Sequence, residues 1–199
     1  MLFVCFLIIN FQFCVFIVTI LLGDIMIYFI RHGETDYNKD AKFQGHLNIP
    51  LNKEGINQAH VALEQSKQLK LDKIYCSPLS RAKQTAEIIN SYHNTKLIED
   101  VRLKEIYMGS LQGRMLKDLS DEEKRLAFSN PEHFGGETHE QFCSRIISFF
   151  KEIENSDENI LIVSHGGIYR ALYKHLNNLD SLEFNLKPLP NAKIVLLKK

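Results

Sequence analysis

Residues 25–34 read Ile-Met-Ile-Tyr-Phe-Ile-Arg-His-Gly-Glu, an apolar run that ends abruptly in charged and polar residues. The run is short and rich in isoleucine and aromatic side chains, which predicts a fully buried β-strand. Ligands bind outside the carboxyl ends of strands in open α/β sheets, so Arg31 and His32 would lie at a binding edge. An arginine beside a histidine suits an anion such as phosphate, with a nucleophile next to it. Taken alone, Arg-His-Gly is more often a solvated turn.

A second apolar run, residues 159–163, ends in Ser-His-Gly-Gly and so repeats the His-Gly pair at His165 and Gly166. Because the carboxyl ends of parallel strands meet at one edge of a sheet, His32 and His165 should lie close together. The glycines would let backbone and substrate approach closely. Repulsion among the cations should lower the histidine pKa values and leave one imidazole neutral enough to attack.

A third short strand is predicted over residues 73–76, followed by Ser77-Pro78. We expect Ser77 to cap a helix with Pro78 at its first position, which places Arg81 in the first turn. The free N–H groups and positive dipole of a helix start suit an anion. The edge of the sheet would then hold two guanidinium groups and two imidazoles, a pocket for a dianionic phosphoryl group.

The rest of the chain alternates strand and helix patterns around a polar, turn-rich segment, residues 35–50, that we expect to form a loop over the site. Helices are predicted over residues 54–69, about 78–92, 116–128 and 168–176. A further helix is predicted after the capping box Thr138-x-x-Gln141. Short strands are predicted over residues 95–98 and 192–197. The alternation predicts an α/β fold, a three-layer sandwich with a mostly parallel central sheet.

The segment before the first strand, residues 2–22, is almost wholly apolar and long enough to span a bilayer. A signal peptide would need a positive start and small residues before its cut, which are missing here. A membrane anchor fits the length better, and the basic residues that follow would place the domain on the cytoplasmic side. We favour a third interpretation, a mis-set start with translation beginning at Met26. The predicted domains are thus a hydrophobic segment, 1–25, and a domain over 26–199.

Composition excludes several functional classes. The chain has 24 basic and 24 acidic residues, so it lacks the basic field of a nucleic-acid-binding protein. The four cysteines, at positions 5, 14, 76 and 143, are widely spaced, which disfavours a disulfide framework or a zinc site and predicts small buried residues in a reducing compartment. Arginines beside the histidines would also repel a metal cation, so we predict no metal ligands. We predict a cytoplasmic protein, with anchoring in the membrane by residues 2–22 as the alternative.

Several motifs together resemble one known family. The stretch Arg31-His32-Gly33-Glu34-Thr35-x-x-Asn38 resembles the signature of the histidine phosphatase superfamily, in its phosphoglycerate-mutase-like branch. The resemblance continues, in order and with the family's spacing, through Gln44-Gly45, Pro50-Leu51, Gly55-x-x-Gln58-Ala59, Ser77-x-x-x-Arg81-Ala82-x-x-Thr85-Ala86, Leu103-x-Glu105-Ile106-x-x-Gly109, Gly136-Glu137-Thr138 and Ser164-His165-Gly166-Gly167. It covers the chain from about Met26 to the end and leaves the first 25 residues outside.

The resemblance implies a mechanism and a set of site residues. His32 would be the nucleophile that forms a phosphohistidine, and Glu105 the acid that protonates the leaving oxygen and later activates water. Arg31, Arg81 and His165 would hold the phosphoryl oxygens. Further substrate contacts are implied for Gly33, Glu34, Thr35, Asn38, Gln44, Gly45 and Gly166. No metal or organic cofactor would be needed, and the partner would be a phosphorylated small molecule.

The same resemblance favours a phosphomonoester hydrolase over a cofactor-dependent phosphoglycerate mutase. Mutases of the family carry a longer insertion after the catalytic glutamate, whereas only 30 residues separate Glu105 from Gly136 here. They also tend to have asparagine where Gly167 stands, and this stretch is similar to that of α-ribazole phosphatases and broad-specificity phosphatases. A non-catalytic phosphate-binding module on the same fold is the third alternative. The substrate, and whether the protein forms a homodimer, stay open.

Overall fold

The computed structural model describes residues 25–179 and 189–199 of the chain. Its strands are β1 (Ile27–Arg31), β2 (Lys73–Cys76), β3 (Lys96–Glu99), β4 (Ile160–Ser164) and β5 (Ile194–Lys198). Its α-helices are α2 (Asp36–Lys39), α3 (Lys53–Ser66), α4 (Ser80–His93), α5 (Asp121–Ser129), α6 (His139–Ile153) and α7 (Gly166–Asn177). Short 3₁₀ helices are η1 (Val101–Leu103), η2 (Gly109–Leu111), η3 (Leu116–Asp118) and η4 (Pro131–Phe134).

The strands form one mixed, mostly parallel sheet in the order β3-β2-β4-β1-β5. β1 and β4 are parallel neighbours in register from Ile27–Ile160 to Arg31–Ser164, so both strands end at the same level. β2 runs parallel to β4 on its other side, whereas β5 runs antiparallel to β1. The predicted α/β fold is confirmed, and the carboxyl ends of β1, β4 and β2 meet at one edge of the sheet.

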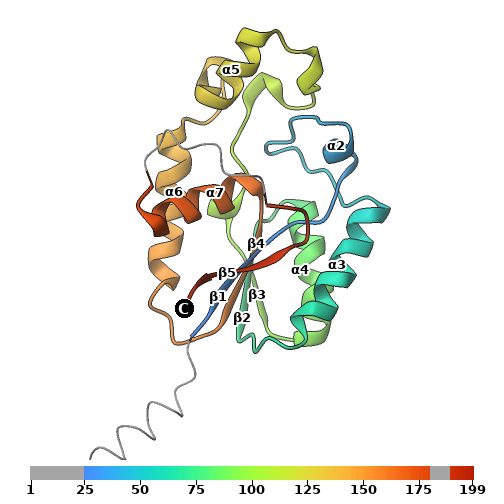
Figure 1. Cartoon of the computed structure of the whole chain (residues 1–199), viewed down its shortest axis with the longest axis vertical. Helices are drawn as coiled ribbons and strands as arrows, with labels where there is room; N and C mark the ends of the chain where they lie inside the picture. The colour runs from blue at the N-terminus through green and yellow to red at the C-terminus, as the bar shows by residue number, and fades with distance from the viewer. Residues whose placement is uncertain (1–24, 180–188) are drawn as a thin grey trace, which may run out of the picture.

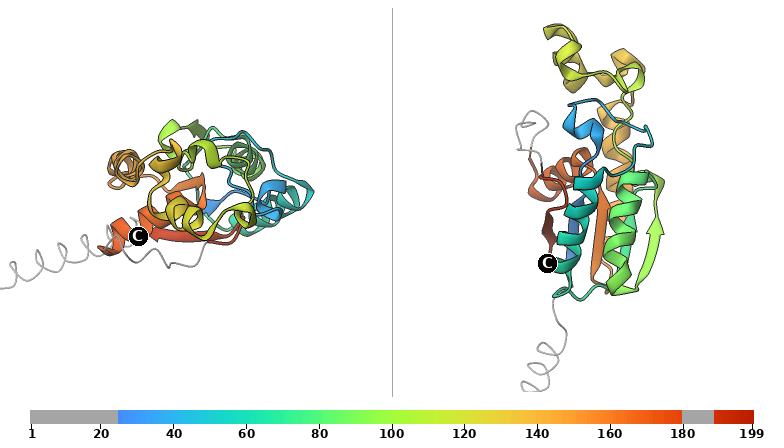
Figure 2. Two further views of the ribbon diagram at one scale, coloured as in Figure 1. Left: turned by 90° about the horizontal axis from the view of Figure 1, so that it is seen from above. Right: turned by 90° about the vertical axis from the view of Figure 1, so that its right-hand side faces the viewer.

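Helices cover both faces of the sheet, as Figures 1 and 2 show. On one face, α6 and α7 pack against Phe29 and Ile162 through a core that includes Phe149 and Phe150. On the other face, α3 and α4 cover residues of β1, β2 and β4. Side chains alternate between the two cores along β1, where Phe29 faces one and Ile30 the other. A smaller apolar cluster joins Met108 and Leu111 to Leu119 and Ala127 of the segment that carries α5, and Figure 1 shows this segment above the carboxyl edge of the sheet.

Two predicted helices differ from those in the structure. The helix after β2 begins at Ser80, with Leu79 and not Ser77 at its N-cap, while Ser77 Oγ contacts His165 and accepts the Leu79 N–H at 3.3 Å. The predicted helix over residues 116–128 is broken into η3 and α5, and Ser120 starts the second piece with a capping box to Glu123. The predicted loop 35–50 contains the short helix α2.

The interpretations of the amino-terminal segment fall on residues 1–24, outside the described part, as do Cys5 and Cys14. No helix among residues 25–179 and 189–199 combines the length and the apolar character needed to cross a membrane. Cys76 is a buried free thiol as predicted, whereas Cys143 is only partly buried and lines the cavity described below.

Candidate active site

The register of the two central strands brings the two predicted histidines together. Arg31 is the last residue of β1 and pairs with Ser164, the last residue of β4. The His32 N–H then donates to the Ser164 carbonyl at 2.9 Å, which fixes the chain where the strand ends. The ring centroids of His32 and His165 lie 5.2 Å apart with the rings inclined at 61°.

The His32 imidazole is held in one tautomer. Its Nδ1 lies 2.7 Å from the Gly33 carbonyl oxygen, and because a carbonyl can only accept, Nδ1 carries the proton. The lone pair therefore resides on Nε2. Burial, followed by the charges of Arg81 and Arg31, holds the pKa of His32 well below 6.5. The direction predicted from the sequence is confirmed, although burial contributes more than repulsion. A neutral imidazole with a free Nε2 lone pair is the form that can act as a nucleophile.

His165 is fully buried at the N-cap of α7, and its Nε2 lies 2.8 Å from Ser77 Oγ. Burial and the charge of Arg81 also hold its pKa well below 6.5. When the Ser77 hydroxyl donates to Nε2, the proton of the neutral ring lies on Nδ1. Nδ1 has no hydrogen-bond partner among the described residues. This arrangement makes Nδ1 a donor available to an anion.

Two arginines line the same site with buried nitrogens that lack an acceptor. Arg81, in the first turn of α4, is 1 % exposed and donates to the carbonyls of Gly45 and Leu47, both at 2.8 Å. Arg31 donates to the Leu189 carbonyl at 2.9 Å. Within the described part of the chain, the Nε atoms of both arginines have no partner, and burial lowers the pKa of Arg81 to about 10. Buried donors without acceptors are uncommon, and here they converge on a site suited to a phosphoryl group.

Glu105 joins the site from the irregular segment after η1. Its Oε2 accepts from the Gly167 N–H at 3.1 Å and its Oε1 from its neighbour's N–H, that of Ile106, at 3.0 Å. A Cβ atom on Gly167 would lie 2.2 Å from Glu105 Oε1, so with any other residue there the carboxylate would have to leave this position at the start of α7.

Four of these residues open into one cavity of about 810 Å³, whose lining does not include His165. His32, Arg31, Arg81 and Glu105 lie in its wall beside Gln44 and Gly45. The lining also has apolar side chains from several elements, among them Phe43, Phe128 and Phe142, and two cations from α7, Arg170 and Lys174. The cavity therefore combines a group of anion-binding side chains with an otherwise largely apolar lining.

The other predicted contact residues lie behind or beside this cavity. Thr35 and Asn38 form the capping box of α2, and Thr35 Oγ1 also donates to Gln44 Oε1 at 3.1 Å. Glu34 turns towards α3, where its Oε1 accepts from Asn52 at 2.9 Å. Gly33 packs on the backbone of Gly55, since a Cβ there would lie 2.4 Å from the Gly55 oxygen. A direct substrate contact for these four residues stays a prediction, whereas their structural roles are visible.

Gly166, also predicted to bind substrate, lies beside Arg31. A Cβ at Gly166 would meet Arg31 Nε at 3.6 Å, an ordinary contact. Its contact with substrate likewise stays a prediction. Among the described residues, no group of three or more histidine, cysteine, aspartate or glutamate side chains is placed to hold a metal ion.

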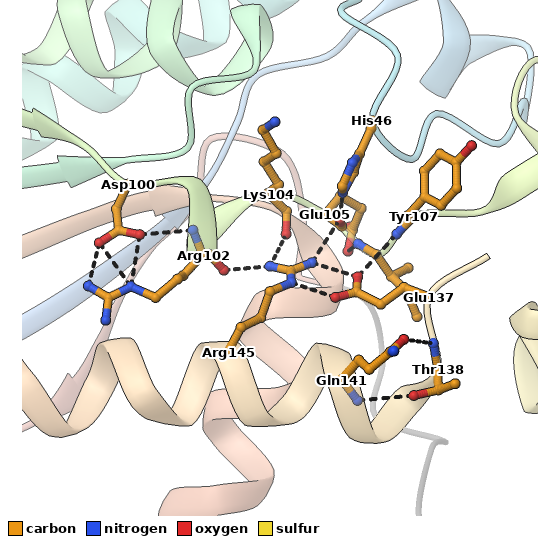
Figure 3. Close-up of polar contacts among 11 residues, drawn as sticks. His46, Asp100, Arg102, Lys104, Glu105, Tyr107, Glu137, Thr138, Gln141 and Arg145 are labelled. Atoms are coloured by element: carbon orange, nitrogen blue, oxygen red, sulfur yellow. Dashed lines mark hydrogen bonds and ion pairs between the residues drawn. The ribbon is translucent and has the colours of Figure 1, made fainter.

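Sequence reasoning missed the groups that hold the backbone of Glu105. Figure 3 shows Arg145, from α6, between the Glu137 carboxylate and the carbonyls of Arg102, Lys104 and Glu105. The His46 ring donates from Nε2 to the Glu105 carbonyl at 2.8 Å, and burial lowers the His46 pKa, so the ring is neutral. The motif Gly136-Glu137-Thr138 was the available signal, but it did not identify Arg145 as the partner.

Comparisons with known proteins agree with this geometry. A model of the histidine phosphatase superfamily (branch 1) matches residues 27–198. The chain is 36% identical over 153 residues to the uncharacterized phosphatase PhoE of Bacillus subtilis, covering 76% of this chain and 77% of that one. It is 33% identical over 150 residues to the probable phosphoglycerate mutase GpmB of an Enterobacter species, covering 71% and 70%. Among solved structures, a putative α-ribazole-5′-phosphate phosphatase from Escherichia coli K-12 superimposes with a TM-score of 0.78 at 26% identity, covering 87% of this chain and 90% of that one.

Proposed function

The chain belongs to branch 1 of the histidine phosphatase superfamily, and on this premise we propose that it hydrolyses small-molecule phosphomonoesters through a phosphohistidine on His32. The observation that carries the proposal is the state of His32. Its Nδ1 is fixed by the Gly33 carbonyl, and among the described residues its Nε2 lone pair is free and the Nε–H groups of its neighbours Arg31 and Arg81 have no partner. A neutral nucleophile beside two fixed cations is suited to attack a phosphorus atom that carries negative charge.

In the first step, His32 Nε2 attacks phosphorus and the bond from phosphorus to the ester oxygen breaks. The protonated Glu105 carboxyl gives its proton to the departing oxygen, which leaves as an alcohol. Arg31, Arg81 and His165 Nδ1 donate hydrogen bonds to the phosphoryl oxygens as charge moves onto them. The products of this step are the free alcohol, a phosphohistidine and the Glu105 carboxylate.

In the second step, the Glu105 carboxylate takes a proton from a water molecule as the water oxygen attacks phosphorus. The phosphorus–nitrogen bond breaks, and its electron pair returns to His32 Nε2. Inorganic phosphate leaves, with His32 again neutral and Glu105 again protonated, so the enzyme regains its starting state. The arginines supply the positive charge throughout, so the scheme uses no metal ion.

The size of the cavity favours hydrolysis over phosphoryl transfer back to a bound intermediate. A mutase must keep water away from its phosphohistidine. The cavity here is about 810 Å³, whereas a water molecule occupies roughly 30 Å³ of liquid, so water fits beside a small ester. The apolar lining formed by Phe43, Phe128 and Phe142 can accommodate the alcohol part of a range of esters.

The chain should hydrolyse p-nitrophenyl phosphate in the presence of EDTA, because its own cations stabilise the transition state. The same protein, given 3-phosphoglycerate with a trace of 2,3-bisphosphoglycerate, should release phosphate faster than it forms 2-phosphoglycerate. A phosphate assay and an isomer assay on one sample compare the two rates. Activity that requires added metal would contradict the mechanism, and rapid isomerisation without phosphate release would favour the mutase.

A further inference from the structure

The backbone that carries Glu105 makes few hydrogen bonds of its own. Residues 104–108 follow η1 and form neither helix nor strand. Partly buried carbonyl groups in such a segment need donors from elsewhere in the fold. The position of the Glu105 carboxyl group therefore depends on side chains that bind the segment from outside.

Arg145 is the main such donor, and it lies on α6 across from the segment (Figure 3). Its Nη1 donates to the carbonyls of Arg102 and Lys104, the latter at 2.7 Å, and its Nη2 donates to the carbonyl of Glu105 at 3.1 Å. One planar guanidinium group thus binds three backbone carbonyls that lead up to and include Glu105. Lysine could not reproduce this, because it is a point charge without the rigid fork.

Glu137 holds Arg145 in place and also binds the segment after Glu105, at the backbone of Tyr107. It accepts from Arg145 Nε at 2.7 Å and from Nη2 at 2.8 Å, a bidentate pair in which the two side chains are 19 % and 14 % exposed. Its Oε2 also accepts from the Tyr107 N–H at 3.3 Å, and its own N–H donates to the Tyr107 carbonyl at 2.8 Å. The Arg145–Glu137 pair therefore binds the backbone before Glu105, at residues 102 and 104, and after it, at Tyr107.

The space for the Glu105 carboxylate is narrow. It fits against Gly167 only because that residue has no side chain, and it accepts the Gly167 N–H at 3.1 Å. A shift of the backbone by about 1 Å would break this contact or drive the carboxylate into α7, and such displacements of reacting groups cost about 100-fold in rate.

We propose that the Arg145–Glu137 pair positions Glu105 for proton transfer, and that Arg145 is a positioning residue of the reaction as well as a link between η1 and α6. The proposal rests on the proposed function, because it gives Arg145 a role only through Glu105. A purely structural salt bridge would affect every step of turnover alike. A positioning residue should instead affect the steps in which Glu105 moves a proton.

Arg145→Gln tests the proposal through its dependence on the leaving group. p-Nitrophenolate leaves without a proton, whereas an alkoxide needs one. We expect kcat/KM for n-propyl phosphate to fall about 100-fold, the cost of a misplaced reacting group. With p-nitrophenyl phosphate, a rapid burst of p-nitrophenol equal to the enzyme concentration should persist, followed by slow turnover, because water activation still needs Glu105.

Two further variants keep the test decisive. Arg125→Gln, at an exposed position on α5, is the matched control and should behave as the wild type. Glu137→Gln removes the ion pair with little change of shape and should give the same pattern if Arg145→Gln does not fold. Equal losses on both substrates, with a burst slowed by the same factor, would overturn the proposal.

A double-variant cycle separates this proposal from the proposed function. In a Glu105→Gln background, Arg145→Gln should cost less than threefold on n-propyl phosphate, because residues that act through one another are not additive. Additive losses would reject the positioning role. If the wild type itself forms no phosphohistidine, the proposed function fails, whatever the Arg145 variants do.

Discussion

Replacing His32 with alanine should abolish phosphatase activity, with kcat for p-nitrophenyl phosphate reduced at least ~10⁴-fold, as for other enzymes that lose their nucleophile. No other described side chain of the cavity combines a neutral, fixed ring with a free lone pair beside Arg31 and Arg81. The loss should appear in kcat for every substrate, since the attack on phosphorus is common to all of them. Steady-state release of p-nitrophenol measures it directly.

Two variants control for effects on folding. His32→Asn can still donate from its amide to the Gly33 carbonyl but has no nucleophilic nitrogen, so it should be as inactive as alanine while keeping a wild-type melting temperature. His60→Ala changes an exposed histidine of α3 and should leave activity unchanged. Substantial residual activity in both His32 variants would contradict nucleophilic catalysis by this residue.

Glu105→Gln should show the second largest effect, and that effect should depend on the leaving group. Glutamine keeps the shape of the side chain but can neither give nor accept the proton. We expect kcat/KM for n-propyl phosphate to fall about 10³-fold, within the usual range for a general acid. For p-nitrophenyl phosphate the first step should fall less than tenfold, because this leaving group needs no proton.

Rapid-mixing measurements separate the two steps of the Glu105→Gln reaction. A burst of p-nitrophenol followed by slow turnover shows that the phosphoenzyme forms rapidly and is then hydrolysed slowly. Glu87→Gln, at an exposed position on α4, serves as the control. If Glu105→Gln reduces both substrates by the same factor and shows no burst, Glu105 is not the proton donor.

The sequence was sufficient to predict the sheet and the core of the site, because local patterns determine both. The apolar runs before His32 and His165 predict buried strands, and parallel pairing then requires their ends to meet. Arg81 does lie in the first turn of a helix as predicted, although that helix begins at Ser80 and not directly after Ser77. The lowered pKa of both histidines also followed from placing cations at one buried edge.

Two helix boundaries that were predicted from single local signals were wrong. Ser77-Pro78 is a favourable helix start, but the helix begins at Ser80, and Ser77 Oγ contacts His165, a residue 88 positions away, while it accepts the Leu79 N–H. The capping box at Ser120 interrupts the apolar pattern of residues 116–128 and starts a new helix. The second boundary has a local signal of its own, the capping box Ser120-x-x-Glu123, whereas propensity alone does not move the first boundary to Ser80.

The support of Glu105 could not be predicted because no local pattern encodes it. Arg145 lies 40 residues after Glu105, and its carbonyl partners carry no sequence signature. Asn38 forms the capping box of α2 with Thr35, a local role that the sequence analysis did not assign, and its contact with substrate stays a prediction. The arrangement around an active site depends on such pairings and becomes visible only in the folded chain.

The central claim, a covalent phosphohistidine on His32, is tested most directly by trapping the intermediate. The protein is mixed with p-nitrophenyl phosphate, quenched within milliseconds in denaturant at alkaline pH, where phosphohistidine survives, and mapped by mass spectrometry. Glu105→Gln should raise the yield by slowing the second step. We predict one phosphoryl group per chain, located on His32. A phosphoryl group on another residue, or none in either protein during steady turnover, would contradict the mechanism.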